Sequence, residues 1–140
     1  MNTNYLFVKV FKLEKNYAYR IIYYENYKEI TNDDIKLTRP PYGNINSLIK
    51  KNVTTPIITW DVDTNDWLYR DANRTYNHIL ENAQDGDIIL MHDIYKETLD
   101  AVKLVVPELI ARGYKITTVS DLANEKGVTL EAKKVYRSVN

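Results

Sequence analysis

The stretch Asp85-Gly86-Asp87-Ile88-Ile89-Leu90-Met91-His92-Asp93 and the amphipathic segment after it, residues 96–112, carry the clearest structural signal in the chain. The Asp-Gly pair is typical of a turn, and the apolar run that follows is typical of a buried strand. Large apolar residues recur at helical spacing in residues 96–112 and are expected to face inward: Leu99, Val102, Val106, Leu109 and Ile110. A strand followed by a helix that ends at a glycine, here Gly113, is the building unit of a parallel sheet.

The rest of the chain from residue 35 repeats this alternation. Short strands are predicted at residues 35–37, 56–62 and 115–119. Helices are predicted at residues 44–51, 72–83 and 121–124, the first capped by Asn44 and the last by Ser120. In such α/β folds functional residues gather at the carboxyl ends of the strands. The sequence therefore predicts an α/β domain with its site at one edge of the sheet.

The first 34 residues follow a different pattern. Residues 5–11 and 17–24 each combine aromatic with β-branched side chains and are separated by a Lys-Asn pair, which predicts a β-hairpin. We therefore divide the chain into a divergent N-terminal segment, residues 1–34, and an α/β part, residues 35–140.

Composition limits the possible functions. In a chain of 140 residues, 19 basic side chains balance 19 acidic ones, so no net field attracts nucleic acid. The absence of cysteine excludes disulfides, thiolate metal sites and a cysteine nucleophile. The sequence contains no apolar run of signal-peptide length and no membrane span. Taken literally, it predicts a cytoplasmic chain.

The motif Arg39-Pro40-Pro41-Tyr42-Gly43 follows the first predicted strand of the α/β part. Two prolines and a glycine favour a rigid turn that leaves Arg39 at the strand end and the Tyr42 amide free to donate. A fixed N–H group beside a guanidinium can stabilise an oxyanion or orient a carboxylate. A surface turn with a solvated arginine is the alternative.

The motif Asp63-Thr64-Asn65-Asp66-Trp67 follows the next predicted strand. A carboxylate beside an aromatic ring can pair with an arginine or hold a histidine in one tautomer. A calcium loop of the Asp-x-Asp-x-Asn type would need a glycine and a distal glutamate that are missing here. A plain turn before a helix capped by Asp71 or Asn73 is the remaining alternative.

The motif Leu90-Met91-His92-Asp93 ends the strand of the opening stretch. A partly buried imidazole at the carboxyl end of a strand can act as a general acid near neutral pH. His78 lies in the preceding predicted helix and fits no helical spacing for metal ligands with His92. We interpret His78 as an ordinary helix residue.

Together the three motifs resemble those of the polysaccharide deacetylases, the NodB-homology carbohydrate esterases. The resemblance covers residues 35–124, with Arg-Pro-Pro-Tyr-Gly, Trp-x-x-Asp-x-x-Asp-Trp and Leu-x-His-Asp in the order and spacing of the family. It implies a partial, distorted (β/α) barrel from which the N-terminal hairpin diverges. The implied reaction is hydrolysis of N-acetyl groups of an N-acetylglucosamine-type polymer, such as peptidoglycan or chitin. Intact members are expected to use a divalent metal such as zinc.

The resemblance also implies roles for the residues of the first motif and of the pair that follows it. Arg39 would orient the aspartate that acts as the base. The Tyr42 amide would help to bind the oxyanion, and Pro41 would lie with it at the substrate. Either Asp63 or Asp66 would pair with Arg39 or tune the histidine, and we favour Asp66.

By the same resemblance, Trp67 and Leu90 would form the wall of an acetyl pocket. His92 would protonate the leaving amine.

Two family motifs are missing from this sequence. Family members begin with Thr-Phe-Asp-Asp-Gly and then carry His-x-x-x-His, which supply the base and an Asp-His-His metal site. The nearest match, Asn32-Asp33-Asp34, lacks the glycine, and the chain has only 2 histidines. We therefore expect no metal site in this chain and a truncated or split deacetylase that is inactive alone. Open sheet edges would then favour a separate N-terminal fragment or a homodimer. Family members are usually exported, which leaves the localisation open.

Two other interpretations remain. One is a non-catalytic carbohydrate-binding module that uses Tyr42, Trp60 and Trp67 to stack on sugars. The other is an unrelated small α/β protein in which the three motifs mislead.

Overall fold

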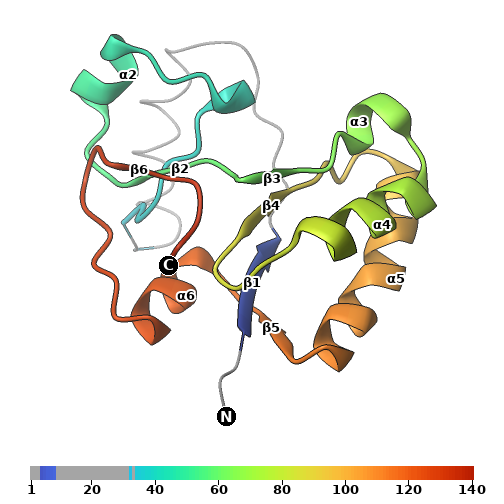
Figure 1. The fold of residues 1–140 in the computed structure, drawn as a ribbon. Helices are drawn as coiled ribbons and strands as arrows, with labels where there is room; N and C mark the ends of the chain where they lie inside the picture. The colour runs from blue at the N-terminus through green and yellow to red at the C-terminus, as the bar shows by residue number, and fades with distance from the viewer. Residues whose placement is uncertain (1–3, 9–31, 33) are drawn as a thin grey trace. The chain divides into compact units, whose positions relative to one another are not determined.

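A computed structural model describes residues 4–8, 32 and 34–140 of the chain. Its contacts divide the chain into two compact units, and each is described here by itself. Of the described residues, unit 1 contains 4–8, 59–129 and 137–140. Unit 2 contains residues 32, 34–58 and 130–136. Figure 1 shows the elements of both units.

Unit 1 is built on a parallel sheet with the order β3-β4-β1-β5. Its strands are β1 (Asn4–Val8), β3 (Val62–Asp63), β4 (Ile88–Leu90) and β5 (Tyr114–Ile116). Its helices are α3 (Asp66–Tyr69), α4 (Ala72–Asn82), α5 (Lys96–Ala111) and α6 (Val119–Glu125). The order of strands and helices from β3 onward confirms the mixed α/β architecture expected from the sequence.

The helices α4 and α5 lie side by side and share the main core of unit 1 (Figure 1). This core brings together side chains from β3, α4, β4 and α5: Val62, Ile79, Ile89, Met91, Val105 and Leu109. On the inner face of α4, Ile79 is fully buried, and Tyr76, Leu80 and Ala83 pack against the core.

The buried face of α5 differs from the prediction. The fully buried stripe is Thr98, Ala101, Val105 and Leu109, at spacings of three and four residues. Leu99 and Ile110, which were expected to face inward, are 52% and 58% exposed. The apolar pattern was broad enough to fit two overlapping faces, and contact with α4 selects the one that carries the smaller side chains.

The helix caps of unit 1 are polar side chains that bind free backbone N–H groups. Asp71 accepts from Arg74 N at 3.0 Å and begins α4. Thr118 accepts from Asp121 N at 3.1 Å and begins α6, so the cap predicted at Ser120 is two residues too late. Several polar residues lie next to one another at this point, and the sequence alone did not distinguish which one caps the helix.

The strand predicted at residues 5–11 is observed as β1, but its place in the sheet was not expected. Phe7 is in register with Ile88 of β4, and Leu6 is in register with Ile116 of β5, both in parallel. The strand therefore lies inside the sheet and does not pair at its edge. The second strand of the predicted hairpin, residues 17–24, lies outside the described residues.

Unit 2 contains a 3₁₀ turn at Pro41–Gly43, helix α2 (Ser47–Asn52) and the parallel strands β2 (Ile57–Ile58) and β6 (Val135–Tyr136). Its core is formed by Ile49, Val53 and Ile57. The cap of α2 is Asn46, which accepts from Ile49 N at 2.9 Å, and not Asn44 as predicted.

Two predicted strands are shorter than expected. The strand predicted at residues 35–37 is replaced by one bridge between Thr38 and Ile57. The strand predicted at residues 56–62 is divided into β2 and β3, which belong to different units.

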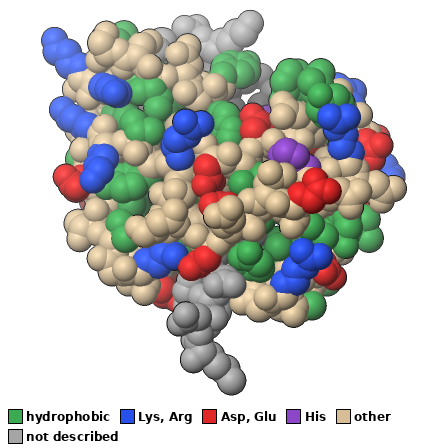
Figure 2. All heavy atoms as spheres, in the orientation of Figure 1, with side chains coloured by type: hydrophobic (Ala, Val, Ile, Leu, Met, Phe, Trp, Pro, Cys, Tyr) green, Lys and Arg blue, Asp and Glu red, His purple; other side chains and the backbone are tan. Residues whose placement is uncertain are grey.

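The described strands form a four-stranded and a two-stranded sheet, and they do not close into a barrel. No helix in the described part of the chain is long and apolar enough to cross a membrane. On the face that Figure 2 shows, acidic and basic side chains are interspersed.

The two faces of α5 can be distinguished by truncating neighbouring residues. Leu109→Ala should lower the free energy of unfolding by about 2–5 kcal/mol, because it leaves a cavity in the core of unit 1. Ile110→Ala, the matched control on the exposed side, should change it by less than about 0.5 kcal/mol. Urea denaturation measures both values. Equal losses for the two variants would contradict the observed face.

Candidate active site

The register of β3 and β4 brings two of the sequence motifs together. Asp63 lies beside Leu90 in this parallel pair, so the residues just beyond both strands emerge at the same edge of the sheet. The chain after Asp63 turns at Asn65, which has a left-handed conformation with φ of 50°, and α3 begins at Asp66. The chain after Leu90 reaches His92 two residues later.

The Asp66 carboxylate lies at the centre of this arrangement and is 1% exposed. Its Oδ1 lies 2.7 Å from Nδ1 of His92. Its Oδ2 accepts from the backbone N–H of His92 at 2.7 Å and from the Thr98 hydroxyl at 2.6 Å. Three donors therefore satisfy a carboxylate that would be costly to bury alone.

These contacts also determine the charge of Asp66. Burial raises the pKa of a carboxyl group, but the hydrogen bonds from Thr98 and from the side chain and backbone of His92 outweigh it. The pKa of Asp66 consequently lies below its usual value of 3.8. Asp66 is ionised at neutral pH and can accept from all three donors.

His92 is held by its backbone and by one ring nitrogen. With Nδ1 directed at an ionised carboxylate, the neutral imidazole carries its proton on Nδ1. The side chain is 32% exposed, and Nε2 is the nitrogen left to exchange a proton with a substrate. The ring lies 6.4 Å from that of Tyr95, at a tilt of 54°.

The other aspartate of the motif has a different role. Asp63 accepts from Asn65 N at 3.0 Å and from the Trp60 indole N–H at 3.2 Å. Between the two aspartates, the buried Thr64 hydroxyl donates to the Leu90 carbonyl at 2.8 Å and ties the loop to the end of β4. The sequence left open which aspartate pairs with His92, and the structure places Asp66 there.

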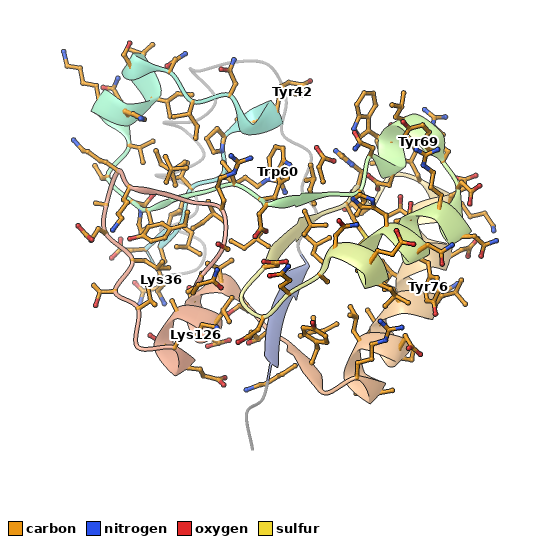
Figure 3. All side chains as sticks on the ribbon, in the orientation of Figure 1. Lys36, Tyr42, Trp60, Tyr69, Tyr76 and Lys126 are labelled. Carbon is orange, nitrogen blue, oxygen red and sulfur yellow. The ribbon has the colours of Figure 1, made fainter. Side chains whose placement is uncertain are left out.

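The aromatic and apolar residues predicted around an acetyl pocket differ in exposure. Trp67 is 46% exposed on α3, next to Leu68 and Tyr69, whose ring projects from the same helix (Figure 3). Leu90 is 5% exposed, and its side chain belongs to the interior of unit 1.

The residues of the first motif belong to unit 2. Tyr42 is 85% exposed and has φ of 57°, and it projects from the 3₁₀ turn (Figure 3). The turn is closed by Gly43 N–H to Pro40 and by Asn44 N–H to Pro41, both at 3.1 Å. Arg39 and Pro41 are half-buried.

Comparison with known proteins supports the resemblance carried by the motifs. No protein-family model matches the chain. Over 88 residues it is 42% identical to the peptidoglycan-N-acetylglucosamine deacetylase PgdA of Listeria monocytogenes, which covers 63% of this chain and 19% of that protein. A solved T48 deacetylase with substrate has a TM-score of 0.72 at 34% identity, over 81% of this chain and 56% of that one.

A family 4 acetyl xylan esterase from Clostridium thermocellum, solved in complex with a cobalt ion, has a TM-score of 0.74 at 28% identity. The alignment covers 83% of this chain and 59% of the esterase. In sequence and in fold, the chain matches a part of the polysaccharide deacetylases. It spans only part of its relatives, from 19% of the Listeria protein to 59% of the esterase.

The described part of the chain offers few donor side chains that could hold a metal ion together. Among residues 4–8, 32 and 34–140, no group of three or more His, Cys, Asp or Glu side chains could hold a metal ion. His78 is half-buried on α4, where its Nδ1 lies 3.5 Å from the Asn82 amide nitrogen. The described residues therefore do not fit the metal of the related esterase, and no step below is routed through one.

Thr98 is the contact of the site that sequence reasoning missed. It lies two residues after the start of α5, and no motif includes it. A signal was nevertheless present, because Thr98 is in phase with Ala101, Val105 and Leu109 and is the one polar member of that buried stripe. A hydroxyl buried in an apolar stripe requires a hydrogen-bond partner, and Asp66 is that partner.

A second pair of acidic residues lies where β3 and β4 begin, with Asp61 directly before β3 and Asp87 directly before β4. Asp87 is 7% exposed and accepts from Gln84 N at 2.7 Å, while Asp61 accepts from Ile88 N at 2.9 Å. Burial and the neighbouring Asp61 carboxyl raise the pKa of Asp87 to about 6. Unlike Asp66, Asp87 therefore binds a proton more readily in the folded chain than in the unfolded chain.

Asp66→Asn should destabilise the fold. The amide group replaces one carboxylate oxygen by a donor, which then faces a donor of His92 or Thr98, and we expect a loss of about 1–3 kcal/mol. The Asp66 contribution should be present above about pH 4 and lost as the pH falls through the lowered pKa of the folded state. Chemical denaturation at several pH values measures both effects. The exposed neighbour Asp93→Asn is the control, and an equal loss there would contradict the contact.

The contribution of Asp87 to stability should have the opposite pH dependence from that of Asp66, and Asp87→Asn should remove it. Between the ordinary pKa of 3.8 and the folded value of about 6, the folded chain binds more protons than the unfolded chain. Wild-type stability should therefore rise as the pH falls from about 7 towards 4, whereas the variant should lack this rise. Thermal unfolding at each pH gives the comparison. Parallel pH profiles for the two proteins would contradict the raised pKa.

Proposed function

We propose that the chain provides the acid side of a polysaccharide deacetylase site, with His92 as the general acid. In this reaction the C–N bond of a tetrahedral intermediate breaks, acetate is released, and the leaving nitrogen takes a proton to become an amine. The 2.7 Å contact between Asp66 and Nδ1 of His92 is the observation that carries the proposal, because it leaves Nε2 to deliver that proton.

Asp66 supports this role by its charge. An ionised, buried carboxylate stabilises the imidazolium that must form before the proton is delivered, and it fixes the orientation of the ring. The backbone N–H of His92 donates to the same carboxylate at 2.7 Å, so the ring and its own backbone are held by one group.

The remaining roles rest on the family resemblance. Arg39 orients the aspartate that acts as the base, and the Tyr42 amide, with Pro41 beside it, binds the oxyanion side of the substrate. Trp67 and Leu90 form the wall of the pocket that holds the acetyl group. The exposure of Trp67, 46%, supports a substrate contact for its ring, whereas Leu90 would contribute only the small part of its surface that is accessible.

The substrate that we propose is an N-acetylated polysaccharide, and specifically the glycan of peptidoglycan. The support is the similarity to the Listeria peptidoglycan-N-acetylglucosamine deacetylase at 42% identity. Chitooligosaccharides carry the same N-acetyl group without the peptide and lactyl groups, so a comparison of the two polymers distinguishes the substrates.

We further propose that the sheet of unit 1 forms part of a distorted (β/α) barrel whose base and metal ligands come from outside this sequence. A separate N-terminal fragment would supply them. The two histidines of the sequence support this, since one is the proposed acid and the other is on α4. The chain alone therefore lacks the groups that activate water.

The chain alone should not deacetylate. Purified protein should release no acetate above background from peptidoglycan or chitooligosaccharides, with or without added zinc, because positioning and acid groups remain without an activated nucleophile. An acetate assay measures this. Zinc-dependent release by the purified chain would contradict the proposal, and glycan binding without release would favour the binding-module interpretation.

The acid role can be tested in a chimera in which residues 35–140 replace the corresponding part of the Listeria deacetylase. The chimera should release acetate, and His92→Ala should lower kcat by about 10²–10⁴-fold, as expected for loss of a general acid. His78→Ala in the same chimera is the matched control and should leave kcat unchanged. An active chimera that tolerates His92→Ala would contradict the assignment.

A further inference from the structure

The Thr98 hydroxyl is the third donor to the Asp66 carboxylate, and it differs from the other two in origin. Both remaining donors belong to His92, one to each carboxylate oxygen. The Thr98 hydroxyl comes from α5 and lies 2.6 Å from Oδ2. It is therefore the only one of the three that does not move with the residue that the carboxylate is meant to orient.

The position of Thr98 is fixed by packing. Its side chain is 3% exposed and continues the buried stripe of α5, which Ala101, Val105 and Leu109 anchor in the core of unit 1. The χ2 torsion of an aspartate is broad when nothing restrains it. A third donor from a rigid helix removes that freedom and sets the plane of the carboxylate.

Thr98 also favours the charged form of Asp66. Burial acts against ionisation, and the hydrogen bond from Thr98 is foremost among the contacts that lower the pKa of the carboxyl group. A hydrogen bond from a hydroxyl to a carboxylate is about twice as strong as one between neutral groups. Without it, Asp66 would retain only the two contacts with His92, through the backbone N–H and through Nδ1.

We propose that Thr98 is a positioning residue that holds the Asp66 carboxylate in the orientation in which His92 carries its proton on Nδ1 and presents Nε2 to the substrate. The catalytic meaning of this arrangement rests on the proposed function of His92. The arrangement itself does not, because it concerns where one proton resides in the isolated chain.

Nitrogen-15 NMR of the full chain labelled at histidine tests the proposal, because the shifts of Nδ1 and Nε2 report the tautomer directly. In the wild type, neutral His92 should be mainly the Nδ1–H form. In Thr98→Val, which keeps the shape and removes the hydroxyl, the Nδ1–H fraction should fall by about twofold or more, and the pKa of Asp66 should rise. His78 provides an internal reference in the same spectra.

Two further variants separate positioning from simple packing. Thr98→Ser restores the hydroxyl. It should return the His92 tautomer and the Asp66 pKa to their wild-type values, even if the lost methyl group lowers stability. Thr75→Val, at a threonine of α4 that is 2% exposed, should leave the His92 signals unchanged. If Thr98→Val does not fold, Thr98→Ala removes the same hydroxyl without adding volume.

The proposal would be overturned if a folded Thr98→Val or Thr98→Ala protein kept the wild-type His92 tautomer and the wild-type Asp66 pKa. Failure of Thr98→Ser to restore these two properties would also overturn it. An active chimera that tolerates His92→Ala would instead refute the proposed function and leave the NMR result standing. The two failures are therefore distinguishable.

Discussion

The buried carboxylate of Asp66 is the constraint on which the site depends. A carboxylate that is 1% exposed is tolerated only when its oxygens are satisfied, and its three donors come from the end of β4 and from α5. Asp66 itself begins α3. One side chain therefore ties three elements together at the edge of the sheet where the strands end. A shift of any of these elements would leave a charge or a donor buried without a partner.

The sequence predicted this part of the molecule well because the signals were local. The apolar run before His92 and the aspartate motif after a buried strand both indicated strand ends, and parallel strands bring their ends to one edge. From that rule alone, Asp66 and His92 were expected in one site. The pairing register, Asp63 with Leu90, then determines which aspartate reaches the histidine, and register is a property of two strands that no single segment encodes.

Other features were not predictable from local patterns. The buried face of α5 is selected by α4 across the core, so Leu99 and Ile110 remained exposed although their spacing is helical. Thr98 was not predicted because the helical pattern was drawn from large apolar side chains, and Thr98 is a small polar residue on the same face of α5 as Ala101 and Val105. The place of β1 between β4 and β5 depends on pairing over more than eighty residues, which no turn or repeat in the sequence signals.

Stability alone does not explain the contact between Asp66 and His92. Replacing a buried ionic pair by apolar side chains of similar volume is often neutral or stabilising, so such a pair is weak evidence for a structural role. All the contacts that build it lie within unit 1, between Thr64 and Thr98, and none depends on the residues of unit 2. Contacts within unit 1 thus fix the orientation of the half-exposed imidazole of His92. The proton transfer that we propose at Nε2 requires this geometry, whereas folding alone does not.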